Sequence, residues 1–83
     1  MTKSVFSDRY RQFLLVLANE RQAHGVTQVE LAQRLGKPQS FVSKIERGER
    51  RIDIFELQDY VNAIGISFPD FLHRMFAEKN TRL

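Results

Sequence analysis

Apolar residues recur at helical spacing along most of the chain, and the pattern predicts five helices and no strand. Ser7 is the expected N-cap of the first helix, which runs to about Ala23 before Gly25 stops it. Large side chains at i, i+3, i+4 and i+7 of this helix form one stripe that faces a core. The stripe consists of Tyr10, Phe13, Leu14 and Leu17.

Local signals bound the second and third helices. Thr27 is followed three residues later by Glu30, the pattern of a capping box, and the helix that starts there ends at or just before Gly36. Pro38 fits the first turn of the third helix, where its missing N–H has no cost, and that helix continues to about Arg47.

The remaining pattern predicts two further helices. Asp53 caps the fourth helix and Gly65 ends it. Its buried stripe is expected to contain Ile54, Leu57, Val61 and Ile64, flanked by Phe55 and Tyr60. Ser67 and Pro69 open a fifth helix over about 69–78, before a frayed polar tail, AEKNTRL. The apolar face of the fifth helix carries Phe68, Phe71, Leu72, Met75 and Phe76.

The chain of 83 residues is expected to form one domain, 1–83, without an internal repeat or linker. A core of this size is small, so buried surface from a partner chain is a reasonable expectation. Five large apolar residues on the fifth helix exceed what such a domain easily covers. We expect Phe68 and Leu72 to face inward, and Phe71, Met75 and Phe76 to lie at a two-fold dimer interface. The alternative is that all five close the core.

Residues 28–47, QVELAQRLGKPQSFVSKIER, have the pattern of two short helices that meet at a tight angle. Ala32 stands where the two helices come closest. Gly36 stands in the turn, where a positive φ is commonly needed and glycine adopts it without steric cost. The apolar contacts that hold the angle are Leu31, Leu35, Val42 and Ile45. This pattern predicts a DNA-binding helix-turn-helix.

Charge is concentrated in the second half of this motif. The formal net charge is +3, and residues 37–51 alone hold five cations and two acids, a surplus of three. The cations are Lys37, Lys44, Arg47, Arg50 and Arg51. A solvated helix face would explain such a run as well, but its overlap with the motif favours nucleic acid.

Other kinds of chemistry find little support. The chain has no cysteine, which removes disulfides, thiolate metal sites and a cysteine nucleophile. His24 and His73 lack neighbours at metal-ligand spacing, and no catalytic triad or phosphate-binding glycine loop is evident, so neither a cofactor nor enzymatic activity is expected. No signal peptide or membrane span is apparent, and we expect a cytoplasmic protein.

The segments TQVELAQRLG, SFVSKIERGERR and AIGIS together resemble the Cro and phage-repressor type of helix-turn-helix protein, the XRE family. The resemblance is strong over residues 21–71 and looser over the whole chain. It implies a lambda-repressor-like, all-α domain of five helices that binds double-stranded operator DNA as a homodimer, with the third helix in the major groove.

Helix geometry assigns base contacts to polar residues on the outward face of the third helix, and the resemblance implies the same positions. These are Gln39, Ser40, Ser43 and Lys44. Gln39 suits adenine and Lys44 suits the acceptors of guanine. Phe41 either touches a thymine methyl or packs on the motif itself. Donors that flank the helix are the candidates for phosphate contacts. They are Gln28, Lys37, Arg47, Arg50 and Arg51, and for the last two simple solvation is the alternative.

The resemblance also implies a structural ion pair, because Arg21 and Glu46 match positions that pair in the family.

From the motif and the resemblance together we expect a dimeric transcription regulator, a repressor rather than an activator. The alternatives are a restriction-modification controller protein, or a protein-interaction module such as the antitoxin of a toxin–antitoxin pair. The sequence shows no disordered extension that would wrap a toxin, which weakens the antitoxin alternative.

Overall fold

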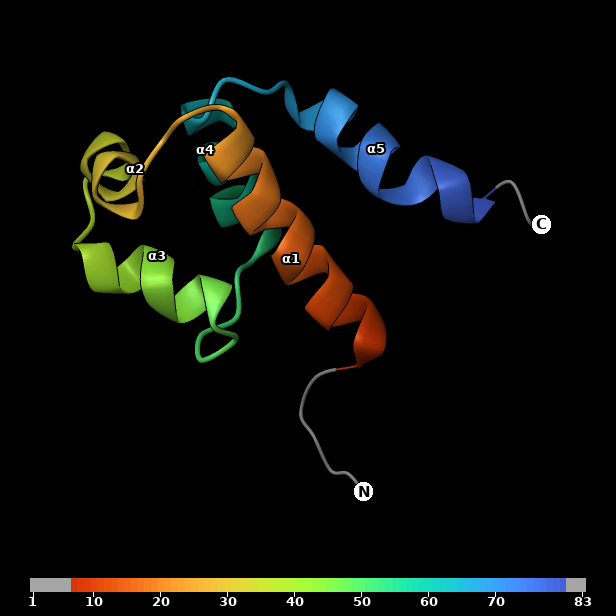
Figure 1. Ribbon diagram of the computed structural model, residues 1–83, viewed down its shortest axis with the longest axis horizontal. Coiled ribbons are helices and arrows are strands. Elements are labelled where there is room, and N and C mark those ends of the chain that lie inside the picture. Colours follow the sequence, from red (N-terminus) through yellow and green to blue (C-terminus); the bar gives the residue numbers. More distant parts are fainter. Residues whose placement is uncertain (1–6, 81–83) are drawn as a thin grey trace.

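The computed structural model describes residues 7–80, and the side chains of residues 7–77 (Figure 1). Five α-helices and no strand occur within this range. Their bounds are α1 Asp8–Ala23, α2 Gln28–Leu35, α3 Gln39–Glu46, α4 Ile54–Ala63 and α5 Phe68–Asn80. The all-α fold predicted from the spacing of apolar residues is confirmed. The predicted frayed tail from Ala77 is wrong as far as Asn80, because α5 continues to that residue; residues 81–83 lie outside the described range.

Side-chain caps explain where the helices begin. The Ser7 hydroxyl accepts from the backbone of Tyr10 at 3.1 Å. Thr27 and Glu30 form both halves of the predicted capping box, at 3.0 and 2.9 Å. A second box, which the sequence reasoning missed, joins Asp53 to Glu56 at 2.8 and 3.1 Å. Each satisfied donor at a helix start contributes on the order of 1 kcal/mol.

The turn between α2 and α3 follows the prediction for Gly36 but not for Pro38. Gly36 adopts φ 68° and ψ 33°, and the next N–H, of Lys37, bonds to the Ala32 carbonyl at 2.9 Å. Pro38 was expected in the first turn of α3 but occupies the N-cap position with an extended backbone, ψ 157°. Its ring has no acceptor, and α3 therefore starts without a side-chain cap.

The core draws on all five helices. The largest side chains that are fully buried are Tyr60, Phe71, Leu17, Leu31, Ile45, Val42 and Val61. One member of the predicted α4 stripe is wrong: Ile54 is 57% exposed. Ile54 is the first residue of α4, and both its neighbours, Asp53 and Phe55, are exposed as well, so the start of the helix lies in solvent, whereas Leu57 one turn later is buried.

The predicted division of the α5 residues is wrong for Phe71 and Met75. Phe71 is 0% exposed and Met75 is 9% exposed, so both belong to the core of the chain and not to the outward face of α5. Phe68 and Leu72, expected to face inward, do pack against the core but are only partly buried. The packing of α5 on α1 explains the burial of Phe71, because its ring packs edge-on against that of Phe13 with the ring centroids 6.4 Å apart.

An ion pair also links the same two helices, since Arg74 of α5 bonds to Glu20 of α1 at 2.8 Å.

Among the helices of residues 7–80, none combines the length and apolar character that crossing a membrane requires.

Candidate nucleic-acid interface

The angle between α2 and α3 is set by buried apolar contacts. In Figure 1, α2 is seen nearly end-on while α3 runs across the view, so the two helix axes are strongly inclined. Leu31 and Ala32 of α2 and Val42 and Ile45 of α3 are all buried. The sequence predicted Ala32 as the point of closest approach and the other three as contacts that hold the angle; Leu35, the fourth predicted contact, is partly buried against the core. As a result, α3 holds one fixed face toward solvent.

That outward face of α3 is polar. Gln39, Ser40 and Lys44 are exposed, as a base-reading role requires. Ser43 is half-buried, and its hydroxyl donates to the Ser40 carbonyl at 3.4 Å. Three of the four predicted base-reading side chains therefore lie on an accessible surface, and Ser43 lies at its edge.

Phe41 is half-buried beneath two cations. The Lys37 ammonium lies 5.3 Å from the ring centroid and the Arg50 guanidinium carbon lies 4.7 Å from it. Such cation–π contacts are worth about 0.5–1 kcal/mol at exposed sites. The ring thus supports two of the predicted phosphate-binding cations, which favours the packing role of Phe41.

The arginines beside α3 already have partners within the chain. Arg47 makes a two-pronged pair with Glu49 at 2.9 and 3.0 Å. Arg50 makes a similar pair with Glu56, also at 2.9 and 3.0 Å, and the Arg51 guanidinium lies over the Tyr10 ring at 4.7 Å. Exposed ion pairs are worth only about 0–1 kcal/mol, so exchanging a carboxylate for a phosphate is inexpensive.

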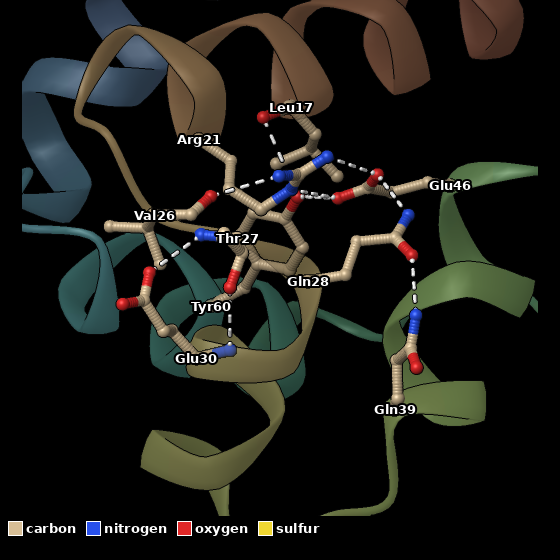
Figure 2. Close-up of polar contacts among 9 residues, drawn as sticks. All are labelled: Leu17, Arg21, Val26, Thr27, Gln28, Glu30, Gln39, Glu46 and Tyr60. Carbon is tan, nitrogen blue, oxygen red and sulfur yellow. Dashed lines mark hydrogen bonds and ion pairs between the residues drawn. The ribbon is translucent and has the colours of Figure 1, made fainter.

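A polar network lies between α1, α2, α3 and α4 and is centred on the carboxylate of Glu46 (Figure 2). Arg21 donates to both oxygens, at 2.7 and 2.9 Å, and donates a further bond to the Val26 carbonyl at 2.8 Å. Tyr60 donates its hydroxyl to Oε2, and the Gln28 amide donates to Oε1 at 3.0 Å. The ion pair predicted between Arg21 and Glu46 is present.

Burial and hydrogen bonds together determine which groups of this network carry a proton. Burial alone would raise the pKa of Glu46, but the hydrogen bonds from Arg21, Tyr60 and Gln28 outweigh it, and the pKa lies below its ordinary value. Burial, together with the bond to Glu46, raises the pKa of Tyr60, so the phenol stays protonated and donates. The bond to Glu46 raises the pKa of Arg21 as well. Glu46 is therefore a buried carboxylate that remains ionised.

Two members of the network have hydrogen-bond partners that the sequence did not indicate. Gln28, predicted as a phosphate contact, bonds to Glu46 on one side and accepts from the Gln39 amide at 3.2 Å on the other. Tyr60 was expected beside the buried stripe of α4 and is fully buried there, with its hydroxyl bonded to Glu46. A buried tyrosine hydroxyl usually has a hydrogen-bond partner, and this was the available signal for its role.

Comparison with known proteins identifies the family. A profile described as helix-turn-helix matches residues 17–71, which include all of α2, α3 and α4. A solved structure described as an XRE-family like protein from Pseudomonas syringae pv. tomato str. DC3000 is 47% identical, with 84% of this chain and 85% of that chain covered and a TM-score of 0.80. The chain belongs to the XRE family of helix-turn-helix proteins. The comparison with curated proteins gave no match.

This XRE-family protein is a DNA-binding regulator, of a class that is generally not enzymatic. The resemblance seen in its motifs is confirmed, together with the fold it implied. The individual base and phosphate contacts stay predictions, and α3 and its flanking loops are the surface to which they apply.

Proposed function

We infer that this XRE-family protein binds a palindromic operator as a homodimer and represses transcription by occupying it. The observation that supports this function best is the exposed polar face of α3, with Gln39, Ser40 and Lys44 held at a fixed angle by the buried contacts to α2. A helix presented in this way enters the major groove, where each base pair has a distinct pattern of donors and acceptors.

The residue types suggest which bases are read. The Gln39 amide has one acceptor and two donors, and it matches the N6 and N7 edge of adenine. The Lys44 ammonium donates to O6 and N7 of guanine. Ser40 can serve either a base or a phosphate. Lys37, Arg47, Arg50 and Arg51, with the backbone at the start of α2, would hold the phosphates on both sides.

Repression follows from occupancy alone. A dimer bound across a promoter excludes polymerase sterically, whereas activation requires a further surface that contacts polymerase.

Selection of binding sequences from a randomised duplex library tests this function. The selected sites are expected to be inverted repeats with half-sites about one helical turn apart, roughly 10 base pairs. Lys44→Ala should relax the preference at one base pair in each half-site, a loss of about 1–3 kcal/mol in discrimination. Arg74→Ala on α5, which lies away from α3 in Figure 1, removes the same charge and should leave the preference unchanged. A library that yields no enriched sequence would refute specific operator binding.

The proposed dimer uses the outward side of α5. Phe68, Leu72 and Phe76 recur at four-residue spacing and therefore lie on one side of the helix. The first two are only partly buried and Phe76 is 39% exposed. A groove of about 270 Å³ borders the same edge and is lined by Tyr10, Phe13, Met75 and Phe76 among others. Burying this apolar stripe against its copy on a second chain supplies surface that a small core lacks.

Sedimentation at micromolar concentration tests the dimer. The parent protein is expected to sediment as a dimer, and Phe76→Glu is expected to sediment as a monomer, because it places a charge within the apolar stripe. The matched control is Phe55→Glu, at an exposed phenylalanine of α4, which should remain dimeric. If the parent were monomeric both with and without operator DNA, the dimer proposal would fail.

A further inference from the structure

We propose that Glu46 determines which way round Gln39 presents its amide to DNA, and that it acts through Gln28. Glu46 and Gln28 are then positioning residues for base specificity. This inference rests on the proposed function, in which Gln39 reads a base.

The three side chains form one continuous relay, drawn in Figure 2. The Gln28 amide nitrogen donates to Glu46 Oε1 at 3.0 Å, and the Gln39 amide nitrogen donates to Gln28 Oε1 at 3.2 Å. Gln28 and Gln39 are the first residues of α2 and α3, so the relay joins the starts of both helices of the motif.

The direction of the relay follows from the charge at its inner end. An ionised carboxylate only accepts hydrogen bonds, so Gln28 can bond to Glu46 only through its NH₂ group. The Gln28 oxygen then faces Gln39, and Gln39 in turn can bond to it only through an NH₂ hydrogen. Turning either amide round would place two acceptors against each other at hydrogen-bonding distance.

The outer end of the relay is therefore left with a defined polarity. Gln39 keeps its oxygen and its second N–H for a ligand, an acceptor beside a donor. Adenine presents the complementary pair in the major groove, the N6 amino donor and the N7 acceptor. A Gln39 side chain that has already adopted this orientation loses less rotamer freedom on binding, which favours adenine over other bases.

The inner end of the relay is anchored in the protein interior. The side chain of Glu46 is 7% exposed, and Arg21 and Tyr60 occupy the sites on its oxygens that Gln28 does not use. A carboxylate accepts about four hydrogen bonds, and this one has four. These four hydrogen bonds hold the Glu46 carboxylate in one orientation, so the Gln28 amide bonds to an acceptor in a fixed position.

The relay itself can be tested without DNA. In ¹⁵N-labelled protein, the side-chain amide signals of Gln28 and Gln39 are expected to differ from those of exposed Gln33. In Glu46→Gln the inner group can donate as well as accept, and the Gln39 signals should move toward those of Gln33. Glu20→Gln, at an ion pair on α1, is the matched control and should leave them in place. Unchanged Gln39 signals in folded Glu46→Gln would overturn the inference.

Gln28→Leu provides a second variant that leaves the pair of Arg21 and Glu46 intact and so avoids an unpaired buried charge. It should also move the Gln39 signals, whereas Gln33→Leu on the same helix should not.

Operator binding then tests the consequence. Gln39→Ala first identifies the base pair that Gln39 reads in the selected operator. Glu46→Gln and Gln28→Leu are expected to reduce discrimination at that base pair about tenfold, with discrimination at the Lys44 base pair unchanged. Retained discrimination at the Gln39 base pair, or an equal loss at every position, would overturn the inference. If the parent protein selects no sequence at all, the proposed function fails instead, and the amide signals alone decide whether Glu46 orients Gln39.

Discussion

Arg21→Ala is expected to lower the free energy of unfolding by about 3–5 kcal/mol, because it leaves the carboxylate of Glu46 buried without its cation. The two side chains are only 8% and 7% exposed, so water cannot replace the guanidinium without opening the structure. The Val26 carbonyl loses its donor as well. A domain of this size typically has 5–15 kcal/mol of stability, and the variant should therefore unfold at much lower urea concentration, measured by circular dichroism.

Two comparisons separate burial from charge in this experiment. Arg74→Ala removes the exposed partner of Glu20 and should cost about 1 kcal/mol or less. Arg21→Met combined with Glu46→Gln removes both charges and should be more stable than Arg21→Ala, because no unpaired ion remains. If Arg21→Ala unfolded like the parent, the ion pair would have no structural role.

Operator affinity is expected to fall roughly a thousandfold when salt is raised from 50 to 200 mM. Contacts to about six phosphates release counterions and give a log–log slope near −5. The measurement is fluorescence anisotropy with the selected duplex at several salt concentrations. Because Arg47 is paired with Glu49 in the free protein, DNA binding requires Arg47 to exchange that carboxylate for a phosphate.

Substitution of single cations measures how much each contributes to this salt dependence. In the proposed dimer Arg47→Ala removes one phosphate contact from each protomer, so it should make the slope shallower by about two units and weaken binding to all sequences alike. Arg74→Ala has the same change in net charge and should keep the slope of the parent. A slope close to zero would mean that phosphate contacts contribute little, which would favour a protein-interaction role for the domain.

The sequence predicted the five helices and the angle of the motif because the signals for them are local. The capping box of Thr27 and Glu30 acts within one helical turn, and Gly36 determines the turn by its own φ. The sequence also predicted which polar residues lie on the outward face of α3, since helical periodicity separates Gln39 and Lys44 from the buried Val42.

The rotation of α5 depended on tertiary contacts. Five apolar residues on one short helix define a broad face, and periodicity cannot say which part of that face meets the rest of the chain. The contact between Phe13 and Phe71, which are far apart in sequence, placed Phe71 inside and left Phe76 partly exposed. The exposure of Ile54 has the same kind of origin, because the start of α4 extends beyond its packing partners.

What the sequence determined by itself was the set of helices, the motif and the residue types on the outward face of α3. Apart from the pair of Arg21 and Glu46, which the family resemblance implied, only the tertiary structure decided how the charged and amide side chains pair. Arg21, Gln28, Glu46 and Tyr60 come from four different helices, and their hydrogen bonds exist only once those helices have packed. Hydrogen bonding depends on distances of about 3 Å and on direction, whereas sequence patterns specify only which face of a helix a residue occupies.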